Sequence, residues 1–447
     1  MADQAPHNLP GLPDVELAQV HVVFRCAAQR PRCIDPRCLS LSCPGSHRHG
    51  ARAPLSTKHG SGEAVWNMCS GAAQAGLLPV AVQSLVSAAP PSSEADARQR
   101  AATLPGGCHL GQLTDLGVRQ ALALGAALRE RYVPALFPPD ALPCAATLSV
   151  RSSNLQRTVA TARGVLSGLY PAAAAQPRAT PVAVRVAPDA TEWLFPNTAA
   201  CARLRDLWAQ RSAAWDTTQG DAAWRSRFAP QLQHIHTALP PHHQHALQRA
   251  WGVVELLDHA TSRQAHGLPP LGALTAAHTD SIRDIASAIV SDMFTGGASN
   301  HGKVDATALG LRLSVGRVLA DVSGSMEARA SHRSQLRMRL FAAHDTTVLP
   351  LLLALSPQGE SHTWPPYASA LTLELWAPKA STEGVASSTS GEHYVRALYQ
   401  GRLLRMPCSE QAHGACTLSS WLECVAPLLP RDWHKDCRVD TRDDSSD

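Results

Sequence analysis

Three features are scarce in this 447-residue sequence, and each scarcity narrows the classes of function. Neither charge sign dominates, because the formal net charge is only +4, which disfavours nucleic acid or an anionic membrane as a partner. The longest apolar runs, around Leu349–Leu355 and Leu77–Val82, fall well short of the roughly 20 residues of a membrane-spanning helix. The first residues are polar and acidic, unlike a signal or transit peptide. The sequence therefore predicts a cytoplasmic protein without integral membrane contact.

Histidine and cysteine are plentiful. Protonation of the 21 histidines would make the surface more positive, which weakly favours anionic substrates. Among the 12 cysteines, Cys408 and Cys416 flank a polar loop and could close a small disulfide, but we favour reduced thiols in a reducing compartment. One group of histidines flanks Pro240-Pro241 with no cysteine or carboxylate at ligand spacing, so we expect surface residues and no metal site. This group comprises His234, His236, His242, His243 and His245.

Strand and helix patterns alternate along much of the chain, which favours an α/β protein. We expect a mixed, mainly parallel sheet flanked by helices, formed by residues 15–191 and 335–437. Residues 192–334 have helical, irregular patterns and predict an inserted α-helical cap lobe. The charged tail 438–447 predicts disorder. The expected strands span residues 19–24, 145–150, 182–186, 336–340, 371–376 and 394–400, with helices at 114–132 and 153–169.

Charged or ionisable groups follow three of the predicted strands, where α/β sheets place their sites. Arg48–Pro54 (RHGARAP) sets a nucleophile between two guanidinium groups in one tight loop. Arg151 ends a later strand just before a helix, and the pair His344-Asp345 follows another strand. Hydrolysis of a phosphomonoester needs a nucleophile, cations around the phosphate oxygens and an acid for the leaving oxygen. These three segments could supply all of them.

The same segments resemble the histidine acid phosphatases. Arg48–Pro54 reproduces the RHGxRxP signature of that family, 344–345 matches its later His-Asp pair, and 151–158 resembles its arginine motif. The resemblance implies an α/β core with a helical cap, and metal-independent hydrolysis without a cofactor. It implies His49 as the phosphorylated nucleophile and Asp345 as the proton donor. The phosphate ligands that it implies are Arg48, Arg52, Arg151 and His344, whereas we expect Arg157 to be a structural ion-pair partner.

Within this family, the sequence is most similar to the lysophosphatidic acid phosphatase (type 6) branch. The segments that carry this likeness are 111–114, 194–197 with Cys201, 264–269 and Trp364-Pro365-Pro366. The resemblance implies a small phosphomonoester substrate, favours a lysophospholipid, and leaves a mitochondrial location open. A phytase-like or general phosphatase is the alternative within the enzyme class.

One segment departs from the family pattern. In the family the first strand runs directly into the RHG loop, but here residues 26–48 lie between Phe24-Arg25 and His49. Deletion of these 23 residues gives HVVFRHGARAPL, which follows the family pattern without interruption. We interpret the segment as an insertion or a gene-model artefact. If it is present in the protein, a phosphate-binding relic without catalysis is a further alternative.

Overall fold

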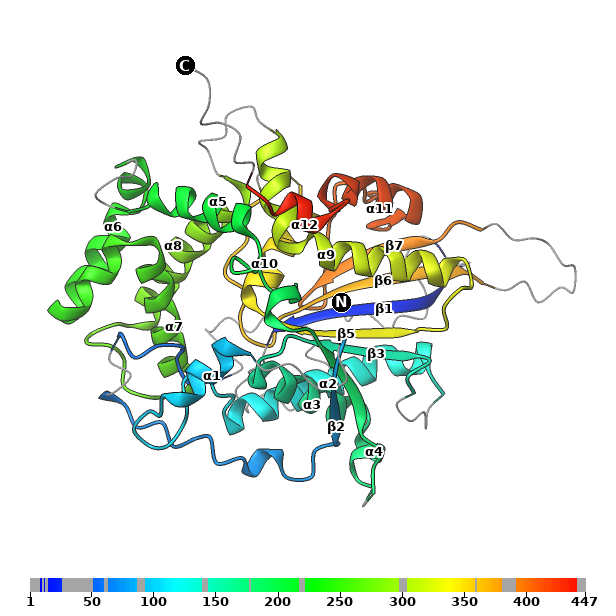
Figure 1. Ribbon diagram of the computed structural model, residues 1–447, viewed down its shortest axis with the longest axis horizontal. Helices are drawn as coiled ribbons and strands as arrows, with labels where there is room; N and C mark the ends of the chain where they lie inside the picture. The colour runs from blue at the N-terminus through cyan, green and yellow to red at the C-terminus, as the bar shows by residue number, and fades with distance from the viewer. Residues whose placement is uncertain are drawn as a thin grey trace, which may run out of the picture.

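The computed structural model describes most of the chain as one α/β arrangement (Figure 1). The residues described are Leu9, Leu12, 15–25, 51–59, 63–86, 93–138, 144–176, 178–216, 222–296, 304–357, 360–379 and 391–439. The predicted insertion, the predicted nucleophile His49 and most of the predicted disordered tail lie outside them.

A mixed sheet forms the centre of the molecule, in the order β2-β4-β3-β5-β1-β6-β7-β8, with β9 paired to β7. The pairs from β2 to β1 are parallel, whereas β6 to β9 add antiparallel strands. The predicted α/β fold with a mixed sheet is therefore confirmed. The strands are β1 (Val15–Arg25), β2 (Val80–Ser84), β3 (Leu148–Ser152), β4 (Val182–Val186), β5 (Met338–Ala343), β6 (Ala370–Pro378), β7 (Tyr394–Tyr399), β8 (Arg402–Leu404) and β9 (Ala415–Thr417).

Side chains that alternate along the central strands build two separate cores, one on each face of the sheet. On β1, Val20, Val22 and Phe24 pack with α2 (Asp115–Leu136) and α3 (Gln156–Leu169). Val23 points to the other face, where the core includes α9 (Val304–Ala330) and α10 (Asp345–Leu355). The sheet is thus covered on both faces, and its strand ends remain available for a site.

Helix α2 begins where the sequence predicts, because the Thr114 side chain accepts a hydrogen bond from the Gly117 amide and caps the helix. It packs closely against α3: at Gly125 and Gly168 a Cβ atom would collide with the backbone of the opposite helix. The shorter helices of the core are α1 (Glu94–Ala101), α4 (Pro171–Ala174), α11 (Leu418–Val425) and α12 (Trp433–Asp436).

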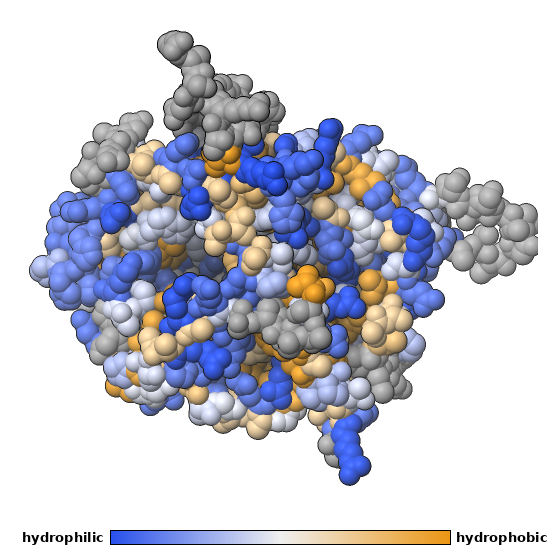
Figure 2. All heavy atoms as spheres, in the orientation of Figure 1, coloured by the Kyte–Doolittle hydropathy of each residue, from blue (hydrophilic) through white to orange (hydrophobic). Residues whose placement is uncertain are grey.

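A helical lobe lies beside the sheet, on the left in Figure 1. It contains α5 (Ala202–Ala213), α6 (Ala222–Ala238), the 3-10 helix η4 (Pro241–Gln248), α7 (Ala250–His266) and α8 (Ala276–Thr295). Hydrophilic residues predominate over this lobe on the face shown in Figure 2. Helix α9 falls within the predicted lobe, but its C-terminal part packs on the sheet, where Gln19 Nε2 donates to Ser325 Oγ (3.1 Å). None of the described helices combines the length and apolar character that crossing a bilayer requires.

The expectation of reduced thiols is wrong for six cysteines. Disulfides join Cys69 to Cys108, Cys201 to Cys437, and Cys408 to Cys416. Sequence spacing could suggest only the last pair, because the other two span 39 and 236 residues and depend on the fold. Disulfides persist in oxidising compartments, so these bonds count against the predicted cytoplasmic location, which stays a prediction.

Candidate active site

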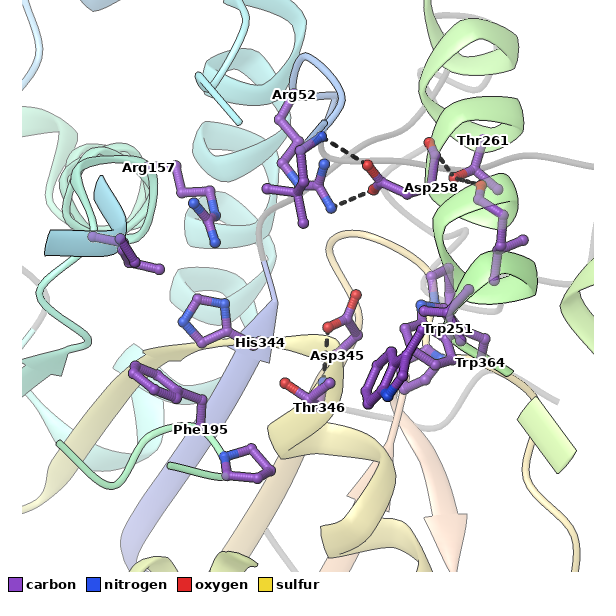
Figure 3. A pocket seen from close by; sticks show the side chains of 18 of the residues that line it. Arg52, Arg157, Phe195, Trp251, Asp258, Thr261, His344, Asp345, Thr346 and Trp364 are labelled. Atoms are coloured by element: carbon purple, nitrogen blue, oxygen red, sulfur yellow. Dashed lines mark hydrogen bonds and ion pairs between the residues drawn. The ribbon is translucent and has the colours of Figure 1, made fainter. Parts of the chain in front are cut away.

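A cavity of about 320 Å³ opens where the carboxyl ends of the parallel strands meet the helical lobe. Arg52, Arg157, His344 and Asp345 lie on one side of it, and Trp251 of the lobe and Trp364 of the segment before β6 (Ala370–Pro378) lie on the other (Figure 3). Residues of all three predicted motifs therefore converge on one space, although the first and the last motif are almost 300 residues apart in the sequence. The predicted nucleophile His49 and its neighbour Arg48 lie outside the described residues.

Arg52 is held by a carboxylate that the sequence did not single out. Its Nη2 lies 2.5 Å from Asp258 Oδ1 of α7, and its side chain is only 6% exposed. The Leu55 amide donates to the other oxygen of Asp258 (2.9 Å), and the Tyr367 hydroxyl donates to the first (3.3 Å). Asp258 thereby joins the RHG loop of the core to the cap lobe.

The electrostatics of this pair keep both groups charged. Burial alone would lower the pKa of Arg52, but Asp258, then Tyr367 and Asp345, outweigh it, and the pKa is raised. Burial likewise opposes ionisation of Asp258, yet Arg52 holds its pKa below the usual value. A fixed guanidinium at the cavity suits an anionic substrate group.

His344 and Asp345 stand at the junction of β5 and α10. Their position follows from the sheet, because Ala343, the last residue of β5, is in register with Arg25 at the end of β1. His344 Nε2 lies 2.9 Å from Ser153 Oγ, and its ring packs edge-on against Phe195. Asp345 opens α10 and lines the cavity, and its Oδ1 accepts a hydrogen bond from the Thr346 amide (2.8 Å).

The two arginines of the 151–158 motif occupy places opposite to those predicted. Arg151 is buried and pairs with Glu192, with Nη2 2.6 Å from Oε1. It is absent from the described lining of the cavity, which includes Arg157 instead. Arg157 Nη1 donates to Gln99 Oε1 (2.7 Å), and its guanidinium group extends toward His344 in Figure 3. The structural ion pair that we expected of Arg157 is thus made by Arg151.

The first turn of α2 anchors the residues that follow His49. The Ala51 carbonyl accepts from the Thr114 amide (2.9 Å) and from its hydroxyl (2.5 Å), and the Ala53 amide donates to the Gln112 carbonyl (3.0 Å). A Cβ atom at Gly117 would lie 2.6 Å from the Ala51 oxygen, so glycine permits this close approach. The segment after the predicted nucleophile is therefore tightly held.

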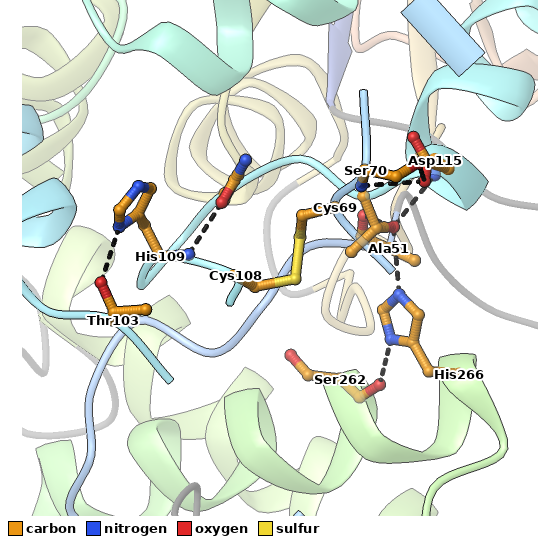
Figure 4. The surroundings of a disulfide bond; sticks show 12 residues. Ala51, Cys69, Ser70, Thr103, Cys108, His109, Asp115, Ser262 and His266 are labelled. Carbon is orange, nitrogen blue, oxygen red and sulfur yellow. Dashed lines mark hydrogen bonds between the residues drawn. A yellow bond between two sulfur atoms is a disulfide. The ribbon is translucent and has the colours of Figure 1, made fainter. Parts of the chain in front are cut away.

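Further contacts join the start of α2 and the segment after His49 to the cap lobe and to the core (Figure 4). His266, in the last turn of α7, places Nε2 3.0 Å from Thr114 Oγ1 and Nδ1 2.8 Å from the Ser262 carbonyl. The Cys69–Cys108 disulfide joins the chain after the loop to the segment that precedes α2. Loop, α2 and α7 thus form one support for Arg52.

Aromatic and aliphatic side chains line much of the opposite side of the cavity, beside Asp258, Thr261 and Arg283 of the lobe. Trp364 is 8% exposed, whereas Trp251 is 39% exposed at the surface of the lobe. The apolar lining residues on or near the lobe are Trp208, Trp251, Val254, Leu257 and Trp364. The cavity therefore combines cations on one side with an aromatic surface on the other.

Sequence patterns gave little signal for the cap residues of the site. Asp258 is one of two acidic residues on the amphipathic helix α7, a position that usually predicts a solvated face. Trp251 and Trp364 are more than 100 residues apart and meet only in the folded chain. The position of Arg157 could have been inferred, because the first turn of a helix that follows a parallel strand lies at the sheet edge where sites form.

Comparisons with known proteins agree with this arrangement. The profile of the histidine phosphatase superfamily (branch 2) matches residues 47–400. Human lysophosphatidic acid phosphatase type 6 is 26% identical over 412 residues, covering 87% of this chain and 84% of the relative. Human testicular acid phosphatase is 31% identical over 330 residues, covering 72% of each chain.

Solved structures share the fold at low sequence identity. The phytase of Hafnia alvei in complex with tartrate has a TM-score of 0.57 at 15% identity, with 95% of this chain and 99% of that chain covered. The multiple inositol polyphosphate phosphatase of Bifidobacterium longum has a TM-score of 0.55 at 13% identity, with 98% and 99% covered. The chain therefore belongs to the histidine phosphatase superfamily (branch 2), as a phosphoric monoester hydrolase of the acid phosphatase kind.

Proposed function

We propose that this phosphatase hydrolyses lysophosphatidate through a phosphohistidine intermediate on His49. One observation carries the proposal: a single cavity joins a cationic edge, suited to a phosphate, to an aromatic wall, suited to an acyl chain. The role of His49 rests on the family signature, since the residue lies outside those described.

The phosphate end is assigned to Arg52, Arg157 and His344, with Arg48 added by the family signature. Arginine suits this role because its planar fork matches two phosphate oxygens at once. Arg157 replaces Arg151 in the set that the sequence predicted, because Arg151 is committed to the buried carboxylate of Glu192.

The chemistry then proceeds in two steps. His49 attacks phosphorus, the bond to the leaving oxygen breaks, and Asp345 gives its proton to that oxygen. Water next attacks the phosphohistidine, Asp345 takes a proton from the water, and phosphate leaves with His49 restored. Arg52 and Arg157 offset the charge that develops on the phosphoryl oxygens in both steps.

The wall of the cavity favours a lipid over a highly phosphorylated inositol. A ligand with many phosphates needs many uncompensated cations, but among the described lining residues Arg52 pairs with Asp258 and Arg283 pairs with Asp280. Burial of methylene groups against Trp208, Trp251 and Leu257 would instead contribute about 0.8 kcal/mol per group. A monoacyl phosphate ester satisfies both sides of the cavity.

The placement of the segments that flank residues 26–48 supports an enzyme rather than a relic. Arg25 ends β1 in register with Ala343, just before His344. On the far side of the segment, Ala51 and Ala53 are buried and anchored to the residues that precede α2. Both flanks are therefore held near the expected position of the nucleophile.

Phosphate release from lysophosphatidate, inositol hexakisphosphate and glycerol 3-phosphate tests the proposal, with the full chain and a chain lacking residues 26–48. We expect the highest kcat/KM with lysophosphatidate, and no turnover in the His49→Ala variant. A higher kcat/KM with inositol hexakisphosphate would instead indicate a phytase-like activity and contradict lysophosphatidate as the substrate. Vanadate binding without turnover in both chains would overturn the proposal in favour of a relic.

A tryptophan variant tests the acyl-chain site. Trp251→Ala should lower the ratio of kcat/KM for lysophosphatidate over glycerol 3-phosphate by about tenfold, because only the lipid buries methylene groups on the indole. Trp224 lies on the same lobe but is not among the described lining residues, so Trp224→Ala is the matched control. An unchanged ratio in Trp251→Ala would contradict the assignment of the wall.

A further inference from the structure

A second group of ionisable side chains lies outside the cavity, where the loop that follows Arg52 meets the cap lobe. Glu63 belongs to the loop, and His242 and His243 belong to η4. One ligand atom from each of the three lies within 4.8 Å of the other two. None of the three is among the described lining residues of the cavity. The fold thus supplies the carboxylate that sequence spacing did not reveal.

His243 is not the surface residue that the sequence predicted. It is 3% exposed, and neither of its ring nitrogens has a hydrogen-bond partner among the described residues. An imidazole buried without partners is costly, because it gives up hydrogen bonds to water and gains none in return. His59, whose ring centroid lies 5.6 Å away, is buried with the same deficit. A ligand that accepts nitrogen lone pairs would remove the cost at His243.

We propose that Glu63, His242 and His243 bind a divalent transition-metal ion, with Zn²⁺ as the ion expected. One carboxylate and two imidazoles form a donor set that zinc takes in proteins, with water in the remaining position. Two ligands at 2.0–2.1 Å in a tetrahedral site are separated by about 3.4 Å. His242 Nε2 and Glu63 Oε1 are 3.7 Å apart, close to that separation.

Small side-chain rotations can bring these ligand atoms to the separation that a zinc site requires. The side chains of Glu63 and His242 are 53% and 63% exposed, so both can turn toward the fixed ring of His243. Arg263 is an opposing cation among the described residues, with Nη2 3.6 Å from Glu63 Oε2, the oxygen that does not face His242. Its Nη1 donates to the Pro269 carbonyl (2.8 Å), so the guanidinium is fixed and can orient the carboxylate from behind.

The bound ion would connect two segments that also support the active site. Glu63 lies between Arg52 and the disulfide at Cys69, and η4 leads directly into α7, which carries Asp258. Zinc would therefore fasten the loop to the cap lobe from outside the cavity. This structural role does not depend on the identity of the phosphatase substrate. The proposal of zinc binding and the proposal of lysophosphatidate hydrolysis can therefore be refuted independently of each other.

Zinc content provides the test. The full chain, freed of metal by a chelator, is equilibrated with Zn²⁺ near neutral pH and separated from unbound ion before the metal is counted. Glu63→Gln and His242→Asn each remove one exposed ligand, and their thermal unfolding without zinc checks that they fold. His236→Asn is the matched control, because His236 is an exposed histidine on neighbouring α6.

We expect Glu63→Gln and His242→Asn each to bind one zinc fewer per chain than wild type, whereas His236→Asn keeps the wild-type number. Zinc should also raise the Tm of wild type and of the control more than that of the two ligand variants, because a ligand of the native state stabilises it by mass action. The proposal is overturned if wild type retains no zinc, if both ligand variants keep the full number, or if the control loses an ion as well.

Discussion

The Arg52–Asp258 pair offers the sharpest test of how the cap supports the active site. Asp258→Asn keeps the shape of the side chain but removes its charge, leaving the buried Arg52 guanidinium without its hydrogen-bonded counter-charge. The amide also has only one acceptor oxygen for three donors, Arg52 Nη2, the Leu55 amide and the Tyr367 hydroxyl. Removing one partner of a buried pair costs about 3–5 kcal/mol, so we expect the free energy of unfolding to fall by that amount.

Urea unfolding of Asp258→Asn, Arg52→Gln and the double variant measures this coupling directly. The double variant should be less destabilised than the sum of the single variants, because it leaves no charge unpaired. The same loss of support should lower kcat/KM by about a hundredfold in Asp258→Asn, because a shift of about 1 Å in a substrate-positioning group has that cost.

Asp292 of the cap provides a matched control for this substitution. Burial raises its pKa, and its Oδ2 accepts a hydrogen bond from Trp215 Nε1 (2.9 Å). Asp292→Asn should therefore cost only about 1 kcal/mol. The account of the Arg52–Asp258 pair would be refuted if Asp258→Asn were no more destabilising than Asp292→Asn, or if the Arg52 and Asp258 effects simply added.

Three further predictions follow from other contacts. Arg157→Ala should lower kcat/KM by about 10²-fold or more at nearly unchanged Tm, whereas Arg151→Ala should lower the free energy of unfolding by about 3–5 kcal/mol; equal effects on stability would contradict the roles assigned. Burial lowers the pKa of His259 to about 4, below the value of about 6.5 expected in the unfolded chain. Below pH of about 6.5 the unfolded chain therefore binds a proton that the folded chain does not, and the free energy of unfolding falls by on the order of 3 kcal/mol as the pH falls toward 4. Urea unfolding from pH 7 to 4 should show a shallower decline in His259→Gln, and an identical decline would be evidence against this. Replacing Cys201 and Cys437 by serine should lower the free energy of unfolding by up to about 5 kcal/mol, since that disulfide closes a loop of 236 residues, and an unchanged urea midpoint would rule this out.

Local patterns were enough to predict the framework of the molecule. The Thr114 cap fixed the start of α2, and the alternating valines at 182–186 identified β4, because capping and a two-residue period are local physical signals. The strands predicted at 371–376 and 394–400 also formed, as the antiparallel pair β6 and β7. Several short elements were missed, among them α1, which is too short and polar to show an apolar face, and β2, which was noticed only as an apolar run.

The parts of the site that depend on tertiary contacts could not be predicted in the same way. Sequence order places Arg151 at a strand end, but whether it points into the cavity or toward Glu192 depends on how β3 and the segment after β4 pack. The partnership of Asp258 with Arg52 links residues 206 positions apart and becomes visible only in the folded chain. Motifs therefore predicted the chemistry, whereas the fold shows which arginine and which residues of the lobe line the cavity.

The most direct test of the central claim is to trap the covalent intermediate. The full chain and the chain lacking residues 26–48 are each mixed with a phosphomonoester carrying radiolabelled phosphate, quenched within the first turnover and digested. The account predicts an alkali-stable, acid-labile phosphate on the peptide that contains His49, absent from His49→Ala, in whichever chain releases phosphate. Turnover without label on His49, or label on another residue, would contradict it.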